Sequence, residues 1–164
     1  MTSLKGLRFI DLFAGIGGIK IGFENAGFQC VFSNDFDKNA KITFDLNLSE
    51  IFESKKQMVL GDIQKILVSK IPDFDILCGG FPCQPFSIAG YKQGFKDENG
   101  RGNLFFDIVR ILKAKKPKAF LLENVKNLKT HGKGNTMKVI LEELEKKLGY
   151  FVKEQVLNTM EYGN

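Results

Sequence analysis

The chain has 164 residues, of which 43% are hydrophobic and 26% are charged, so it is long enough for one globular domain with a real core. No apolar run approaches the ~18 residues of a membrane span, and we expect no secretory signal at the N-terminus. The net charge of +5 favours an anionic partner, with nucleic acid as the first candidate. The 3 cysteines follow no metal-binding spacing and indicate reduced thiols in a cytoplasmic protein.

Apolar runs and helical patterns alternate along the chain. Strands are expected in the apolar runs at residues 7–13, 29–35, 57–63, 73–80, 118–125 and 150–158. Helices are expected at residues 21–28, 37–48, 103–116 and 135–149. Strands that alternate with helices in this way form a mostly parallel sheet with helices on both faces. The pattern therefore predicts a single α/β domain.

Residues 84–103 interrupt this alternation. The stretch is rich in glycine and polar side chains, which favour turns over regular elements. A connection of this length is uncommon in a compact domain, and it usually has a function, often as a lid over a site. We therefore expect a functional loop after the fourth strand.

The motif "DLFAGIGG" lies where the first strand gives way to a helix. Its glycines, Gly15, Gly17 and Gly18, allow a tight turn and the close approach of a ligand to the backbone. The full dinucleotide fingerprint would have a glycine at the position of Lys20. This departure weakens the case for a pyrophosphate and leaves room for another nucleoside, such as S-adenosylmethionine.

Two acidic residues and a phenylalanine follow the next strands. Asp35 ends the second strand, where a carboxylate can accept hydrogen bonds from both ribose hydroxyls. Phe36 can stack on an adenine, and Asp62, after the third strand, can accept from the adenine amino group. The alternative is a glycine turn with two solvated aspartates. Because ligands bind at the carboxyl edge of such sheets, we favour a cofactor site.

Cys83 lies in "GGFPCQPFS", just past the fourth strand. A proline on each side restricts the backbone around it. A free thiol has a pKa near ~8.5, so some thiolate is available at neutral pH, and nearby positive charge would increase that fraction. We interpret Cys83 as a nucleophile. The alternative, a buried structural cysteine, is the interpretation that we give to Cys30 and Cys78.

Glu123 directly follows the apolar run "AFLL". A carboxylate at a buried strand end is costly unless something binds it. Partial burial would raise the pKa of Glu123 and let it hold a proton, which it can donate to a ring nitrogen. The alternative is a glutamate that caps a helix or forms a salt bridge.

Together these motifs resemble those of the cytosine-5 DNA methyltransferases. The resemblance is carried by "DLFAGIGG", "SNDFDKNA", "GDI", "GGFPCQPFS" and "LLENVKNL", and it runs from about residue 7 to the end of the chain. It implies a Rossmann-like sheet of the kind found in S-adenosylmethionine-dependent methyltransferases. The compact spacing of the motifs suggests a bacterial or phage restriction–modification system.

The resemblance also implies a mechanism. A cytosine is flipped out of double-stranded DNA, and the Cys83 thiolate adds to carbon 6 of its ring. Glu123 holds ring nitrogen 3, and carbon 5 takes a methyl group from S-adenosylmethionine.

Roles for further residues follow from the same resemblance. It places the S-adenosylmethionine site at Phe13, Gly15, Ile16, Gly17, Gly18, Asp35, Phe36, Asp62, Ile63, Pro82 and Leu104. Gln84 would reach into the DNA helix, while Ser87 and Arg101 would lie near the phosphates.

The sequence departs from the family's pattern at its end, "LNTMEYGN". The resemblance implies a further proline-glutamine-arginine motif, a target-recognition domain and a seventh strand between the fifth and the sixth. We therefore interpret residues 1–164 as the N-terminal part of a catalytic domain whose sheet is incomplete at its C-terminal edge. Residues 150–158 would lack a neighbour, so we expect either a strand supplied by a second polypeptide or a poorly ordered end of ~15 residues.

Three functional interpretations remain. The chain is one subunit of a split methyltransferase, completed by a partner that carries target recognition. Alternatively, it is a fragment that binds S-adenosylmethionine and does no chemistry. The third is a nucleotide-binding module outside the family with a reactive cysteine, against which the lack of a resolving cysteine near Cys83 speaks.

Overall fold

The structure is a computed structural model that describes residues 6–51, 58–82 and 104–162. The chain forms two compact units, the first ending at Glu123 and the second beginning at Asn124. In the described residues, no helix combines the length and the apolar character that crossing a membrane requires.

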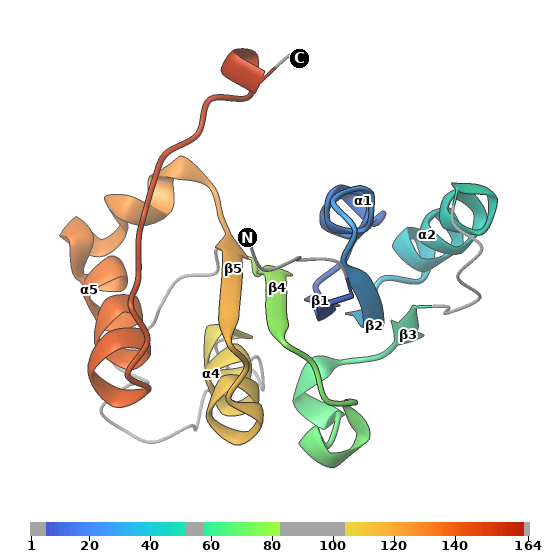
Figure 1. Ribbon diagram of the computed structural model, residues 1–164. Helices are drawn as coiled ribbons and strands as arrows, with labels where there is room; N and C mark the ends of the chain where they lie inside the picture. The colour runs from blue at the N-terminus through green and yellow to red at the C-terminus, as the bar shows by residue number, and fades with distance from the viewer. Residues whose placement is uncertain (1–5, 52–57, 83–103, 163–164) are drawn as a thin grey trace. The chain divides into compact units, whose positions relative to one another are not determined.

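The first unit is built on a five-stranded sheet in the order β3-β2-β1-β4-β5, and every strand pair is parallel (Figure 1). Its strands are β1 (Arg8–Leu12), β2 (Gln29–Asp35), β3 (Val59–Leu60), β4 (Ile76–Gly80) and β5 (Ala119–Glu123). The chain moves outward from β1 to β3 and then returns to place β4 on the other side of β1. Ligands bind beyond the carboxyl ends of the strands at such a reversal, so the order itself marks a candidate site.

Three α-helices accompany the sheet: α1 (Gly18–Asn25), α2 (Lys38–Ile51) and α4 (Leu104–Lys115). Right-handed connections place α1 and α2 on one face and α4 on the other, because the chain crosses the sheet in opposite directions before and after β3. Two short 3₁₀ turns, η1 (Ile63–Lys65) and η2 (Val68–Lys70), join β3 to β4.

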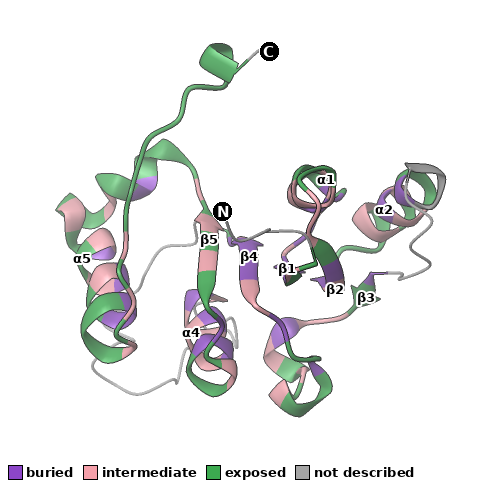
Figure 2. Cartoon of the chain, in the orientation of Figure 1, coloured by how far each residue is buried: buried purple, intermediate pink, exposed green. Residues whose placement is uncertain are grey.

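The central strand β1 is buried on both faces. Phe9 packs with Cys30, Cys78 and side chains of α1, whereas the adjacent Ile10 points to the opposite face and is also fully buried. Figure 2 shows this burial at β1 and β4 in purple. Burial on both faces confirms the predicted arrangement of helices. It also confirms that Cys30 and Cys78 are buried cysteines.

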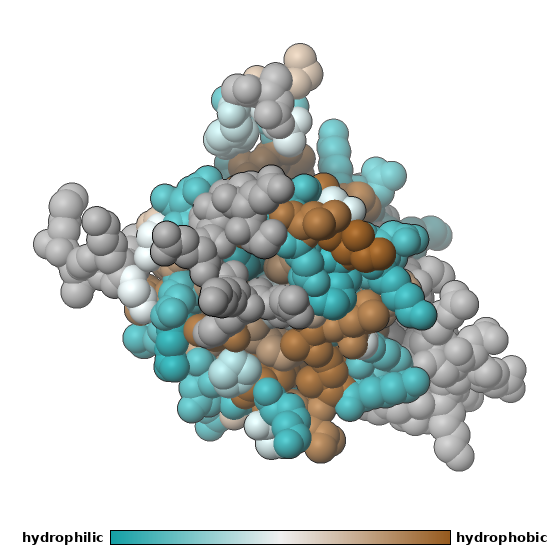
Figure 3. Space-filling model, turned by 90° about the vertical axis from the view of Figure 1, so that its right-hand side faces the viewer, coloured by the Kyte–Doolittle hydropathy of each residue, from teal (hydrophilic) through white to brown (hydrophobic). Residues whose placement is uncertain are grey.

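Burial decreases toward both edges of the sheet. The edge strand β5 alternates exposed and half-buried residues, and Leu121 is 46% exposed (Figure 2). At the opposite edge, Val59 and Leu60 of β3 are 41% and 39% exposed. Figure 3 views the side on which β3 and α2 lie, where apolar patches are interspersed with hydrophilic side chains. β3 has only two residues, far fewer than the predicted 57–63, and so it offers little edge for pairing.

The second unit is helical. It contains the turns η3 (Lys126–Lys129) and η4 (His131–Gly134), the helix α5 (Asn135–Leu141), a π-helical segment η5 (Glu142–Lys147) and the turn η6 (Thr159–Tyr162). The predicted helix 135–149 is therefore present as α5 and η5. It ends at Gly149, whose φ of +76° is costly for other residues.

The predicted strand at 150–158 is wrong, since these residues form no strand and the sheet of the described residues ends at β5. A strand needs a neighbour to accept and donate its backbone hydrogen bonds. Phe151, Val156 and Leu157 of this segment are exposed, and Phe151 reaches 90%. The segment thus has a strand-like sequence but no partner strand among the described residues.

Candidate functional site

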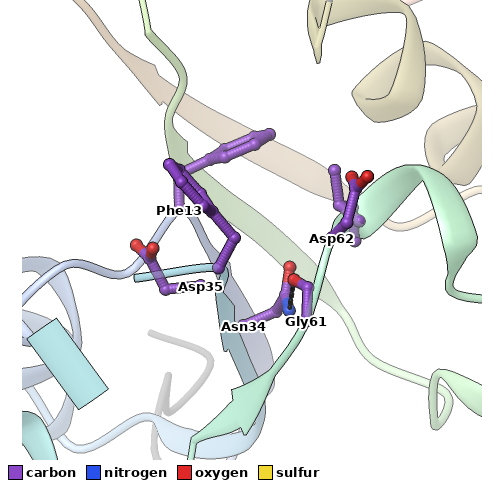
Figure 4. Close-up of a pocket in the computed structure, with 7 residues that line it drawn as sticks. Phe13, Asn34, Asp35, Gly61 and Asp62 are labelled. Carbon is purple, nitrogen blue, oxygen red and sulfur yellow. Dashed lines mark hydrogen bonds between the residues drawn. The ribbon is translucent and has the colours of Figure 1, made fainter. Parts of the chain in front are cut away.

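A pocket lies beyond the carboxyl ends of β1, β2 and β3. Its lining residues come from three separate connections, and they are Phe13, Asn34, Asp35, Phe36, Gly61, Asp62 and Ile63. Figure 4 shows the carboxylates of Asp35 and Asp62 on opposite sides of the pocket, with Asn34 and Gly61 at its lower end in this view. The site occupies the edge at which the strand order reverses.

The glycine turn after β1 is shaped by positive φ angles. Phe13, Gly15 and Gly17 have φ values of +57°, +52° and +95°. Gly17 is also required sterically, because a Cβ there would lie 2.7 Å from Cδ1 of Leu48 and 3.1 Å from Cδ2 of Phe44 on α2. The turn therefore packs directly against α2 and begins α1 at Gly18.

Asp35 joins this turn to the end of β2. Its Oδ2 accepts a hydrogen bond from the Gly15 backbone N–H at 2.9 Å, and its Oδ1 accepts one from the Asp37 backbone N–H at 2.9 Å. Each carboxylate oxygen has a second acceptor site, so Asp35 can still accept from a ligand in the pocket. Two residues that the sequence analysis assigned to the cofactor site, Gly15 and Asp35, are thus in direct contact.

Asn34 is a site residue that the sequence analysis missed. Its side chain is 1% exposed, and its Nδ2 donates to the carbonyl oxygens of Val59 and Gly61, both at 2.9 Å. It therefore fixes β2 to the segment that carries Asp62. A buried amide at a strand end would have been the signal, but burial cannot be read from "SND" alone.

Asp62 and Ile63 form the opposite side of the pocket. Oδ1 of Asp62 accepts a hydrogen bond from the Gln64 backbone N–H at 3.0 Å, which caps η1. Ile63 is 3% exposed and supplies an apolar wall. The cap holds the Asp62 carboxylate at the pocket.

The pocket has an open apolar mouth. Phe36 lines it and is 71% exposed, so one face of its ring is available for stacking. Ile16 is 60% exposed, but it does not line the pocket in the described residues. Pro82, after β4, and Leu104, at the start of α4, do not line it either. Five of the predicted cofactor-binding residues therefore line the pocket. The predicted glycines do not line it, but they form the turn whose Gly15 N–H donates to Asp35.

A second group of predicted residues belongs to the ends of β4 and β5. Gly80 and Glu123 are register partners, and a Cβ on Gly80 would lie 3.2 Å from Oε2 of Glu123. The glycine thus lets the Glu123 carboxylate lie against the backbone of β4, shortly before Cys83. Cys83, Gln84, Ser87 and Arg101 lie outside the described residues.

The expected burial of Glu123 is wrong for this chain, because the residue is exposed. The apolar run before it suggested a buried strand, but β5 is the edge strand of the described sheet and nothing described covers that side.

Comparison with known proteins places these features in a family. The family of C-5 cytosine-specific DNA methylases matches residues 7–164. The chain belongs to this family. The motifs around the glycine turn, Asp35, Cys83 and Glu123 all fall within the matched residues.

Several bacterial methylases are similar to the chain over nearly its whole length. It is 56% identical over 160 residues to the type II methyltransferase M.HaeII of Haemophilus aegyptius, covering 98% of this chain and 47% of that protein. It is 50% identical to M.Bsp6I of Bacillus sp. (strain RFL6), covering 96% and 48%, and 48% identical to M.HhaI of Haemophilus parahaemolyticus, covering 98% and 46%. The chain thus spans about half the length of these curated relatives.

Solved structures show the same fold at lower sequence identity. A putative DNA modification methyltransferase encoded within an E. coli prophage has a TM-score of 0.64 and 23% identity, covering 86% of this chain and 38% of that one. The Dnmt2 methyltransferase of S. pombe has a TM-score of 0.60 and 22% identity, covering 84% and 40%. The chain therefore shares the α/β fold of these two methyltransferases.

Proposed function

We propose that this chain is the catalytic half of an S-adenosylmethionine-dependent enzyme that methylates carbon 5 of cytosine in double-stranded DNA. The observation that carries the proposal is the contact of Asp35 with the glycine turn, which builds a pocket at the strand reversal of a methylase-family chain. The motif that contains Cys83 follows β4 in the sequence, and β4 is the strand next to β1 in the sheet.

The residues that line the described pocket support S-adenosylmethionine as its ligand. Asp35 would accept from the ribose hydroxyls, Asp62 from the adenine amino group, and the exposed ring of Phe36 would stack on the adenine. Phe13 and Ile63 would supply the apolar lining between them. When bound, S-adenosylmethionine supplies the methyl group of the reaction.

The chemistry on the base would belong to Cys83 and Glu123. The Cys83 thiolate forms a bond to carbon 6 of a flipped-out cytosine, which drives ring electrons toward carbon 5. Glu123 donates a hydrogen bond to ring nitrogen 3 and so stabilises the charge that develops there. Carbon 5 takes the methyl group and loses its proton, and the electrons of that C–H bond expel the cysteine as a thiolate.

DNA would be held by the long connection after Cys83 and by the charge of the chain. We propose that Gln84 reaches into the DNA helix, where the flipped-out cytosine leaves a space. Ser87 and Arg101 would contact the DNA phosphates. The net charge of +5 supports an anionic partner of this kind.

We further propose that a second polypeptide or segment, equivalent to the remaining half of the relatives, completes the enzyme. An apolar groove of about 410 Å³ on the first unit supports this, and it is lined by Ile19, Gly22, Phe23, Ala26, Phe28 and Leu121. Leu121 is 46% exposed in a strand whose described neighbour is β4 alone. Contiguous exposed apolar surface of this kind typically marks an interface.

The test of the catalytic assignment is covalent trapping. The purified chain is mixed with S-adenosylmethionine and duplexes containing 5-fluorocytosine, alone and with the part of M.HaeII that this chain does not cover. Fluorine at carbon 5 cannot leave as a proton does, so an attacking thiol stays attached to the base. We expect a denaturation-resistant adduct that the Cys83→Ala variant does not form. An adduct that persists in that variant, or no adduct under either condition, would overturn the assignment.

The groove is tested in the same assay. Leu121→Asp should abolish the stimulation of adduct formation by the added M.HaeII part, because a charge would be buried in an apolar contact. Leu67→Asp is the matched control, since Leu67 is 65% exposed and lies outside the groove. Equal effects of the two variants would exclude the groove as the docking surface.

A fragment that binds S-adenosylmethionine without chemistry is the second candidate. The exposure of Glu123 favours it, because no described residue covers the carboxylate that would hold the base. In that case the chain would bind S-adenosylmethionine and yet form no adduct, even with the M.HaeII part present. The family match over residues 7–164 excludes the third interpretation, a module outside the family.

A further inference from the structure

A buried charge cluster lies beneath the glycine turn, and the proposed chemistry does not use it. Lys20, in the first turn of α1, is 1% exposed, and its Nζ lies 2.5 Å from Oε2 of Glu24, whose side chain is 9% exposed. Burying both charges generally costs several kcal/mol per ion before their attraction offsets it. A lysine held inside a helix–sheet contact therefore calls for an explanation.

Asp11 is the third member of the cluster. It lies on the central strand β1, is 0% exposed, and neither of its carboxylate oxygens has a hydrogen-bond partner in the described part of the chain. Burial raises the pKa of Asp11 to about 7, and the charge of Asp35 adds to this rise. The backbone N–H and the charge of Lys20 oppose the rise from nearby, although that N–H does not reach hydrogen-bond geometry with either carboxylate oxygen. A buried polar group without a partner is uncommon in folded proteins and points to a role beyond packing.

The three residues stand at the two ends of the glycine turn. Asp11 is in the strand that enters the turn, and Lys20 and Glu24 are in the helix that leaves it. The middle of the turn is held separately, where the Gly15 N–H donates to Asp35. The positions of the entering strand and the leaving helix therefore determine where Gly15 meets the carboxylate that lines the pocket.

We propose that Asp11, Lys20 and Glu24 are positioning residues of the nucleoside pocket, which hold α1 against β1 and weaken nucleoside binding when Asp11 ionises. The inference rests on the proposed nucleoside site. With Asp11 protonated the cluster is electrically neutral, because Lys20 and Glu24 cancel. Ionised Asp11 adds an uncompensated buried charge and competes with Glu24 for Lys20, which strains the first turn of α1.

The uncharged groups that face Asp11 are a serine and two cysteines. Ser33 on β2 and Cys78 on β4 are its register partners, and Cys30 shares the α1-facing side of the sheet with Phe9 and Cys78. Burial raises the pKa of both cysteine thiols above their ordinary value, so they stay neutral near pH 7. The charged neighbours are thus Lys20 and Glu24 from α1 and Asp35 from β2.

The experiment measures the affinity of the full chain for S-adenosylhomocysteine by calorimetry on either side of the Asp11 pKa, at about pH 6 and about pH 8. This probe lacks the sulfonium charge, so a change with pH reports on the pocket rather than on attraction to a cation. We expect the Kd to increase about fivefold toward the higher pH, a coupling at the lower end of the usual range. In Asp11→Asn, which stays neutral, the Kd should not change with pH.

Lysine variants provide a second readout. Lys20→Met should weaken binding, and Lys20→Arg, which keeps the charge, should restore most of it. Lys41→Met is the matched control, because Lys41 and Asp45 form a pair of the same i,i+4 spacing on α2 with side chains 23% and 25% exposed. Its Kd and pH profile should match those of the unsubstituted chain. If Lys20→Met does not fold, the Asp11→Asn profile decides the question alone.

The outcomes separate the two proposals. If the unsubstituted chain binds with a Kd that is independent of pH, or if Asp11→Asn keeps the full pH dependence, the positioning role is wrong and the pocket stands. If the unsubstituted chain does not bind S-adenosylhomocysteine at either pH, the nucleoside pocket itself is wrong, and the positioning role is refuted with it.

Discussion

The three glycines of the turn should differ sharply in their tolerance of alanine, and Gly17 should tolerate it least. A Cβ at Gly17 would meet Leu48 at 2.7 Å and Phe44 at 3.1 Å, and the φ of +95° is itself unfavourable for a residue with a Cβ. The left-handed conformation costs about 1–2 kcal/mol and overpacking about 1–3 kcal/mol. The two terms predict that Gly17→Ala lowers the free energy of unfolding by about 2–5 kcal/mol.

Alanine substitutions at Gly15 and Gly18 distinguish the cost of the left-handed conformation from the cost of overpacking. Gly15 has a φ of +52°, and a Cβ added there would have no atom within 4 Å, so Gly15→Ala should carry only the conformational cost of about 1–2 kcal/mol. Gly18 has neither a positive φ nor a neighbour within 4 Å, and it is the first residue of α1. Gly18→Ala should therefore be neutral or stabilising by up to about 1 kcal/mol, because alanine favours the helix.

The assay is urea unfolding followed by far-UV circular dichroism, since the chain has no tryptophan to report by fluorescence. For a chain of this size, each kcal/mol also shifts the Tm by about 2–4 °C, which provides an independent check. The order of stability should be Gly18→Ala, then Gly15→Ala, then Gly17→Ala. A Gly17→Ala variant as stable as Gly18→Ala would refute the argument from positive φ and close contact.

Three further predictions concern the site. Asn34→Leu should lower the free energy of unfolding by about 2 kcal/mol and weaken nucleoside binding, because two backbone carbonyls lose their donor; unchanged urea unfolding would contradict this. The raised pKa of Asp11 means that its contribution to stability is fully present below pH 3.8 and is lost as the pH rises through about 7. Asp11→Asn should remove that loss, of the order of 4 kcal/mol, and a pH profile of unfolding identical to that of the unsubstituted chain would count against it. Gly80→Ala should slow adduct formation with 5-fluorocytosine DNA while leaving stability nearly unchanged, because its Cβ would displace only the end of the Glu123 side chain; equal adduct rates would show that this contact is irrelevant.

Much of the site could be predicted because local sequence patterns determine it. The glycines after β1 and the aspartate after β2 are linked by a strand–helix–strand unit, which brings the carboxyl ends of both strands to one edge of the sheet. The carboxylate of Asp35 therefore lies close enough to the turn to accept a hydrogen bond from the Gly15 N–H at 2.9 Å. The same reasoning placed Phe36 and Asp62 at the pocket. In each case the sequence distance is short and the connection is right-handed, so few arrangements are possible.

The rest depends on contacts between segments that the sequence does not connect. Burial of Asp11 and Lys20 follows from the packing of α1 on β1, and the role of Asn34 follows from the position of β3. The exposure of Glu123 and the lack of a strand at residues 150–158 follow from where the described sheet ends, because an apolar run becomes a buried strand only if another strand or helix covers it. The sequence by itself thus determined the family, the strand ends and the residues available for chemistry. Only the tertiary structure decided which of these residues are buried, joined or left at an open edge.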